Sequence, residues 1–110
     1  MKTRNVFVSN SSSSSFIIIN KSNKELTLVD FVKENPQLVQ DWNSFYGFNN
    51  TQEELIKSAK ENNVEFPANS NDEYIFGDEE GTLIGRIFDY ILRNGGESKN
   101  FKWYFYKSYR

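Results

Sequence analysis

The chain has 110 residues, a net charge of −2 at pH 7 and an aromatic content of 16%, and it contains no cysteine and no histidine. This composition excludes disulfides, Cys/His zinc sites, thiol nucleophiles and a serine–histidine–aspartate triad, and it removes the usual general base near neutral pH. The small charge also disfavours duplex-DNA binding, for which a basic surplus is typical. We therefore expect a protein that is not an enzyme and that needs no metal and no cofactor.

Length and hydropathy pattern predict one domain over residues 1–110, located in the cytoplasm. A chain of this size buries about 60–70% of the surface that the unfolded chain exposes, which is enough for one core of aromatic and aliphatic side chains. No stretch reaches the roughly 18 apolar residues that a membrane span needs. The apolar run that follows the basic residues near Met1 is too short for a signal peptide. We expect no contact with a membrane.

The N-terminal part contains two short apolar and β-branched runs, NVFVS at residues 5–9 and SFIIIN at residues 15–20. Both have the length and the residue types of strands. The polar tract between them has no Asn-Gly pair that would fix a tight turn, so we expect it to form the looser connection of a β-hairpin. Residues 17–19 are apolar on both faces, which predicts a central strand.

Three helices are predicted next from apolar residues at helical spacing, over residues 28–35, 36–46 and 51–61. Thr27 with Asp30 has the spacing of a capping box at the start of the first helix. Thr51 with Glu54 has the same spacing at the start of the third. Gly47 is expected to end the second helix, because glycine adopts the left-handed conformation common just after a helix.

The C-terminal half begins with a predicted loop over residues 66–73 and a short strand over residues 74–76. Thr82 is then expected to cap a strongly amphipathic helix over residues 83–94, which a Gly-Gly pair ends. The acidic residues at 78–80 precede this helix, where the macrodipole favours negative charge. They lack the alternating ligand spacing of a calcium loop, so we favour this structural interpretation over a metal site.

The last segment, residues 101–109, alternates between two kinds of side chain, which is the period of a half-buried strand. Phe101, Trp103 and Phe105 are expected to face the core, and Lys102, Tyr104 and Tyr106 to face outward. The whole order is strand, strand, three helices, strand, helix, strand. It predicts an α+β fold, with a small, mainly antiparallel sheet of about four strands and three to four helices packed on one face.

The most unusual stretch is FVSNSSSSSF, which contains a hydroxyl-rich tract, and three interpretations of it stay open. A phosphate cradle needs glycines and a lysine in a turn that opens a helix, whereas this tract has neither and leads into a predicted strand. A plain solvated loop and a segment that a partner reads or modifies are the other two interpretations. The candidate binding residues of the tract are Ser9, Asn10, Ser11, Ser12, Ser13, Ser14 and Ser15.

A second group of candidate binding residues lies in the C-terminal third. Basic residues alternate with aromatic ones in KNFKWYFYKSYR, which is typical of an edge strand that buries an aromatic face and whose lysines guard against aggregation. The same pattern suits a protein-binding face or, as the least favoured alternative, a single-stranded nucleic-acid platform. Arg86 and Arg93 are spaced to share the polar side of the preceding helix. The candidate binding residues of this group are Arg86, Arg93, Trp103, Tyr104 and Tyr106.

The phrase FVSNSSSSSF at residues 7–16 resembles an N-terminal signature in many small, largely uncharacterised proteins of bacteriophages, prophages and low-GC bacteria. The stretches GTLIGRIFDYILRNGG and FKWYFYKSYR are similar to the ends of such proteins. That family has no established activity, so the resemblance assigns no catalytic residue. It implies a phage- or mobile-element-type accessory protein in the cytoplasm of a bacterial host.

These observations lead to one functional expectation and two alternatives. We expect a protein that binds a host or defence protein and inhibits or adapts it, anti-CRISPR proteins being one such class. The first alternative is a small-ligand binding protein that holds a nucleotide or signalling molecule with the serine-rich loop and Arg86. The second alternative is a structural, virion-associated protein. The identity of the partner and the oligomeric state are left open.

Overall fold

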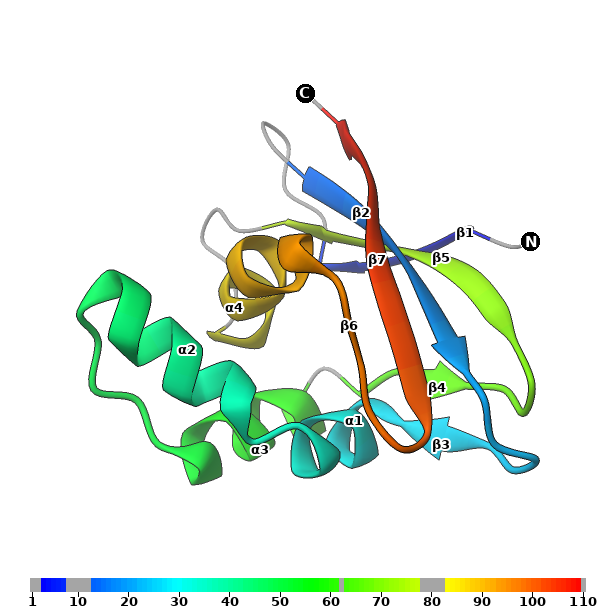
Figure 1. Ribbon diagram of the computed structural model, residues 1–110, viewed down its shortest axis with the longest axis horizontal. Coiled ribbons are helices and arrows are strands. Elements are labelled where there is room, and N and C mark those ends of the chain that lie inside the picture. The colour runs from blue at the N-terminus through cyan, green and yellow to red at the C-terminus, as the bar shows by residue number, and fades with distance from the viewer. Residues whose placement is uncertain (1–2, 8–12, 62, 78–82, 110) are drawn as a thin grey trace.

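The computed structural model describes residues 3–7, 13–61, 63–77 and 83–109, and its main element is a five-stranded sheet with the order β1-β5-β2-β7-β6 (Figure 1). β2 is antiparallel to both of its neighbours, β6 is antiparallel to β7, and β1 is added in parallel to β5 at one edge. The strands are β1 (Thr3–Phe7), β2 (Ser13–Asn20), β5 (Asn71–Gly77), β6 (Gly96–Glu97) and β7 (Phe101–Tyr109).

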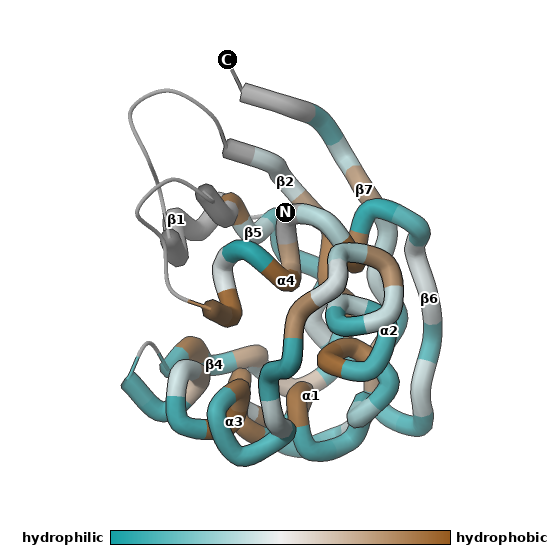
Figure 2. The backbone as a smooth tube through the Cα atoms, turned by 90° about the vertical axis from the view of Figure 1, so that its left-hand side faces the viewer, coloured by the Kyte–Doolittle hydropathy of each residue, from teal (hydrophilic) through white to brown (hydrophobic). Residues whose placement is uncertain are grey.

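Four helices and a small two-stranded sheet complete the fold, and Figure 1 shows the helices gathered on one side of the large sheet. This arrangement confirms the predicted α+β class. In Figure 2, hydrophilic and hydrophobic residues alternate along α1, α2 and α3, as expected for helices with one buried face. The elements are α1 (Leu28–Glu34), α2 (Gln37–Tyr46), α3 (Gln52–Glu61), α4 (Leu83–Ile91), the 3₁₀ turn η1 (Leu92–Asn94), β3 (Leu26–Thr27) and β4 (Glu65–Phe66).

The predicted helix ends are confirmed where the structure describes them. Thr27 and Asp30 form the capping box of α1, with the Thr27 N–H donating to the Asp30 carboxylate over 2.9 Å. Thr51 and Glu54 form the equivalent box of α3, with nitrogen–oxygen distances of 2.8 and 3.1 Å. Gly47 ends α2 in the left-handed conformation at φ 71°. Residues 78–82, with the predicted cap of α4 and the acidic run, lie outside the described residues.

The core is an aromatic cluster between the sheet and the helices. Phe31 of α1 lies at its centre, with its ring centroid 4.8 Å from that of Phe101, 5.1 Å from Trp103 and 5.3 Å from Phe88. The alternation predicted along β7 is confirmed, since Phe101 and Trp103 are buried in this cluster and Phe105 packs against it. Lys102, Tyr104 and Tyr106, on the other face of β7, are exposed.

Two predictions about strands are wrong. β1 and β2 do not form a hairpin, because β5 lies between them and pairs with both. The predicted loop over residues 66–73 also contains the first residues of β5, since Asn71 pairs with Ile19 and Asp72 pairs with Ile18. Both errors have the same cause: pairing with a strand that is distant in the sequence outweighs the local polar pattern. Within the described ranges, no helix has the length and apolar character needed to cross a bilayer.

Candidate functional site

The end of the serine tract is part of the sheet. Ser9, Asn10, Ser11 and Ser12 lie outside the described residues, and Ser13 is described only by its backbone as the first residue of β2. Ser14 and Ser15 follow it in β2 and are buried. The Ser15 hydroxyl donates a hydrogen bond to the carboxylate of buried Glu73 in β5. These two serines therefore belong to the folded sheet and not to a solvated loop.

The structure brings together two of the residues that were singled out separately in the sequence. The Arg93 guanidinium, in η1, donates to the Ser14 hydroxyl and lies 4.9 Å above the ring centroid of Phe105. A cation over an aromatic ring contributes about 0.5–1 kcal/mol at an exposed site. Arg93 thus links η1 to β2 and β7, and this structural role already uses part of its hydrogen-bonding capacity.

The other candidate residues of the C-terminal third lie on different surfaces. Tyr104 and Tyr106 are exposed on the outer face of β7, as predicted. Trp103 points to the opposite face, where its side chain is only 5% exposed. It therefore shares no surface with the two tyrosines, and its accessible edge is reached from the helix side of the sheet. Arg86 is exposed on α4.

An exposed aromatic cluster on α2 and α4 was not predicted, and we call it the aromatic surface. Trp42 lies beneath it and stacks on Phe48, with ring centroids 4.6 Å apart and ring planes 2° from parallel. The rings of Tyr46 and Tyr90 lie 5.3 Å apart and extend the cluster from α2 to α4. The exposed fractions of the clustered rings are Tyr46 48%, Phe48 44% and Tyr90 40%. We include Phe45, which is 63% exposed beside Tyr46 in the last turn of α2 but contacts none of these rings.

Asparagine side chains hold the aromatic surface in place. After Gly47 turns the chain, the Asn43 side chain accepts from the Asn50 N–H at 2.9 Å and donates to the Asn50 carbonyl at 2.8 Å. The Trp42 indole N–H donates to the Asn50 side chain at 2.9 Å. These bonds fold the segment after α2 back onto the helix. The helical spacing of Trp42 with Phe45 or Tyr46 was visible in the sequence, but it gave no indication that Phe45 and Tyr46 stay exposed while Trp42 is buried.

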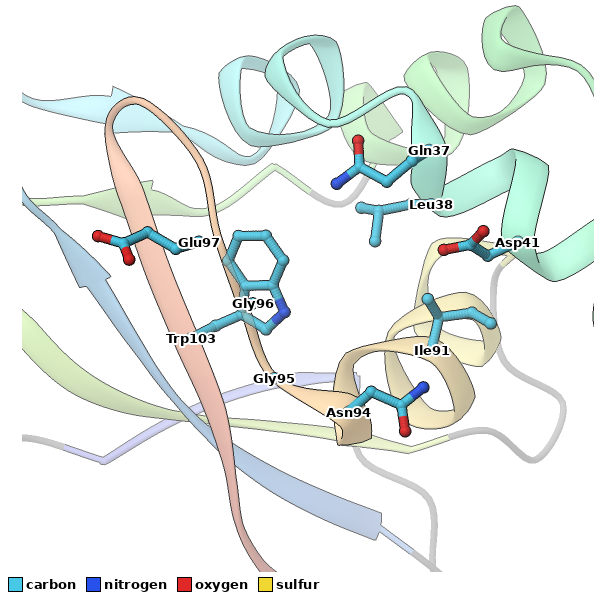
Figure 3. Close-up of a pocket in the computed structure, with 9 residues that line it drawn as sticks. All are labelled: Gln37, Leu38, Asp41, Ile91, Asn94, Gly95, Gly96, Glu97 and Trp103. Carbon is cyan, nitrogen blue, oxygen red and sulfur yellow. The ribbon is translucent and has the colours of Figure 1, made fainter.

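A pocket of about 180 Å³ lies between α2, the end of α4 and the β6–β7 hairpin (Figure 3). Figure 3 shows Trp103 and the β6 backbone on one side, and the side chains of Leu38, Asp41 and Ile91 on the other. The indole nitrogen of Trp103 is on the edge of the ring that faces these side chains. The lining residues are Gln37, Leu38, Asp41, Ile91, Asn94, Gly95, Gly96, Glu97 and Trp103.

The two carboxylates of the pocket have different surroundings. Glu97 forms an ion pair with Lys21 over 2.6 Å, and its carboxylate points away from the other lining side chains in Figure 3. The hydrogen bond and the charge of Lys21 lower the pKa of Glu97 below 4.5. Asp41 is half-buried and makes no ion pair or hydrogen bond with any residue that the structure describes. No lysine or arginine is among the lining residues.

Glu34, at the end of α1, fixes the hairpin that forms one wall of the pocket. Its carboxylate accepts hydrogen bonds from the Ser98 hydroxyl, from the Asn100 N–H at 2.8 Å and from the Asn100 side chain at 2.8 Å. Burial raises the pKa of Glu34, but these hydrogen bonds and the charge of Lys99 together lower it below 4.5. The carboxylate is therefore more stable in its charged form in the folded protein than in the unfolded chain.

Neither a metal centre nor a known relative assigns a function to these surfaces. Over the described parts of the chain, no three acidic side chains lie close enough together to hold a metal ion. Comparisons with protein-family models, with curated proteins and with solved structures found no match. The candidate sites are therefore the aromatic surface, the adjacent pocket and the outer face of β7.

Proposed function

We propose that this chain is an accessory protein of phage or mobile-element type that acts without catalysis, by binding a host or defence protein in the bacterial cytoplasm. Binding would inhibit or adapt that protein, and inhibition of a CRISPR effector is one form that such activity takes. The observation that carries the proposal is the aromatic surface. The resemblance of FVSNSSSSSF to phage proteins supports the biological setting.

The composition of the aromatic surface favours a protein partner. Tryptophan, tyrosine and arginine are the residues that most often dominate binding energy at protein interfaces. Monomeric proteins rarely expose large contiguous apolar patches unless a partner covers them. The patch formed by Phe45, Tyr46, Phe48 and Tyr90 has this character, because four large rings are at least 40% exposed there.

Arg86 places a positive charge on the side of α4 that carries Tyr90. It precedes Tyr90 by four residues, which places both side chains on one face of the helix. Arg86 makes no ion pair with any described residue and is exposed. We expect a partner that presents apolar side chains with a carboxylate beside them, so that the arginine meets an opposite charge at the rim.

The test is a pull-down from a bacterial lysate, followed by identification and calorimetric titration of the purified partner. Tyr46→Ala and Tyr90→Ala remove rings from the aromatic surface, and both side chains are exposed enough that folding should persist. Tyr104→Ala and Tyr106→Ala are matched controls on the outer face of β7. We expect the first pair to weaken binding at least tenfold, because truncating a central aromatic anchor costs about 2 kcal/mol or more. The second pair should bind like the wild type.

Two results would count against the proposal. If the wild-type protein retains no partner that binds it in the titration, the proposed function is wrong. If binding is lost only in the Tyr104→Ala and Tyr106→Ala variants, the function stands but the surface is the outer face of β7. Melting temperatures of all four variants should match that of the wild type, which separates loss of binding from loss of folding.

A further inference from the structure

The pocket and the aromatic surface are adjacent, because α2 and α4 contribute residues to both. Asp41 lines the pocket and precedes Phe45 of the aromatic surface by four residues, so that one face of α2 carries both. On α4, Tyr90 of the aromatic surface and Ile91 of the pocket are consecutive, so the two surfaces adjoin at the end of this helix although the two side chains point in different directions. A partner that covers the rings would therefore also reach the pocket.

We propose that this pocket binds a side-chain carboxamide, namely an asparagine or glutamine side chain of the protein partner. The proposal rests on the proposed function for the source of the amide, but the chemistry of the pocket can be tested without a partner. A volume of about 180 Å³ is below the roughly 300–1,000 Å³ of typical cofactor and drug sites, so it suits a single side chain.

The indole N–H of Trp103 is the first group that points to a ligand. The side chain is only 5% exposed, and its N–H, which solvent reaches through the pocket, makes no hydrogen bond with any residue that the structure describes. The N–H of Trp42, by contrast, donates to Asn50 over 2.9 Å. Buried tryptophan N–H groups usually find an acceptor. Because the Trp103 N–H faces the pocket, a ligand that displaces solvent there must bring its own acceptor.

Asp41 is the second group, and it sets the opposite requirement. Its carboxylate lines the same pocket and has no partner among the described residues, so it favours a ligand that donates hydrogen bonds. A ligand that fits the pocket must therefore carry an acceptor for Trp103 and a donor for Asp41. Between them, Leu38 and Ile91 offer apolar contact for a short methylene chain.

Only a side chain with both functions satisfies the two groups. An ammonium or guanidinium group would pair with Asp41 but would leave the Trp103 N–H buried without an acceptor. A carboxylate would accept from Trp103 but would be repelled by Asp41. A hydroxyl both donates and accepts, but through a single oxygen atom. A carboxamide donates through its nitrogen and accepts through its oxygen, so its two atoms can face Trp103 on one side of the pocket and Asp41 on the other without adding charge.

The experiment is an NMR titration of the ¹⁵N-labelled full chain, which has two tryptophans and therefore two indole signals. The probes are propionamide, propylammonium, propionate and 1-propanol, which share a three-carbon chain. We expect propionamide to shift the Trp103 signal in a saturable way at millimolar concentration, and to leave the Trp42 signal in place. The proposal is wrong if propionamide gives no saturable shift of Trp103, or if propylammonium, propionate or 1-propanol binds as tightly.

The variant Asp41→Asn tests the role of the carboxylate. Loss of the charge should weaken propionamide binding about tenfold, since a hydrogen bond to a charged group is roughly twice as strong as a neutral one. It should also allow propionate to shift the Trp103 signal. Glu53→Gln, at an exposed position of α3, is the control and should behave like the wild type. Equal binding of propionamide to Asp41→Asn and wild type would overturn the assigned donor contact.

These results are independent of the pull-down. If a partner is captured while Trp103 does not respond to propionamide, the pocket chemistry fails and the proposed function stands. If Trp103 responds while no partner is found, the proposed function fails. With a partner in hand, replacing its interface asparagine or glutamine by leucine should weaken binding and abolish the Trp103 shift seen in the complex.

Discussion

At the scale of single residues, the pairing of Gly96 with Trp103 shows how a large ring restricts which residue can lie opposite it. The two residues are directly opposite each other in β6 and β7. A Cβ atom on residue 96 would lie 2.5 Å from Cζ2 of the Trp103 ring. The ring cannot easily move away, because Phe31 packs against it with centroids 5.1 Å apart. Glycine at position 96 is thus required by the space that the indole occupies.

Gly47 is required for a different reason, and the contrast gives a testable prediction. No atom lies within 4 Å of a Cβ built at Gly47, but its φ of 71° disfavours side chains. We expect Gly47→Ala to lower the free energy of unfolding by about 1 kcal/mol and Gly47→Asn to lower it less, because asparagine tolerates this conformation. Gly96→Ala should lower it by about 1–3 kcal/mol through overpacking, and Gly96→Asn should lower it further. Urea unfolding of the four variants measures these differences.

The residue scale also shows where reading the sequence reaches its limit. The inward and outward positions of β7 follow from strict alternation, so their placement was predictable. The importance of Asn20 was not, because it appears in the sequence as a polar residue at the end of a strand. In the structure it is fully buried, donates to the Phe66 carbonyl at 2.9 Å and accepts from the Ser22 N–H at 2.9 Å. Such a role depends on β4 and the turn after β2 meeting in space.

At the scale of secondary-structure elements, Glu34 is the contact that fixes the β6–β7 hairpin to α1. Because the pKa of Glu34 is lowered in the folded protein, its charged form contributes stability above the ordinary pKa of 4.5. This contribution is lost as the pH falls below 4.5 and through the folded-state pKa. The pH dependence of stability in this acidic range should therefore include a part that belongs to Glu34.

The variant Glu34→Gln isolates that part. We expect it to lower the free energy of unfolding by about 1 kcal/mol at pH 7, because the hydrogen bonds to a charged acceptor become neutral ones. The difference in the free energy of unfolding between the wild type and this variant should shrink as the pH falls below 4.5. Chemical unfolding at several pH values measures the difference, with Glu65→Gln, at the exposed position of β4, as the control. An unchanged difference between Glu34→Gln and wild type at low pH would contradict the prediction.

Elements differ in how far the sequence predicts them. α1 and α3 were predicted well because capping boxes act within four residues, and Gly47 marked the end of α2 in the same local way. The strands were predicted less well, because pairing joins segments that are far apart in the sequence. The polar start of β5, at Asn71 and Asp72, looks like a loop until it is paired with the isoleucines of β2.

At the scale of the whole molecule, the candidate sites depend on packing between elements. The aromatic surface needs α2 and α4 side by side, and the pocket needs both of them together with the β6–β7 hairpin. Sequence reasoning grouped Trp103 with Tyr104 and Tyr106 as binding candidates, although the alternation along β7 already placed Trp103 on the opposite face of the strand. Apolar residues at helical spacing over residues 36–46 predicted a helix with one buried face, but Phe45 and Tyr46 in its last turn are both exposed.

The order of the strands also predicts how the protein responds to truncation. β7 pairs with β2 over residues 13–20 and contributes Phe101 and Trp103 to the core. A fragment of residues 1–95, which lacks β6 and β7, should therefore lose cooperative thermal unfolding and the near-ultraviolet circular dichroism of packed aromatic rings. A cooperative transition in this fragment would show that the core forms without β7.

The position of β2 in the middle of the sheet has a consequence for synthesis on the ribosome. The Phe16–Ile19 segment leaves the exit tunnel early, but its partners β5 and β7 are translated much later. During that interval the nascent chain carries an apolar strand with two open edges, which is the kind of segment that aggregates or recruits a chaperone. The hydroxyl-rich tract directly before it would keep that region of the nascent chain hydrated until translation is complete.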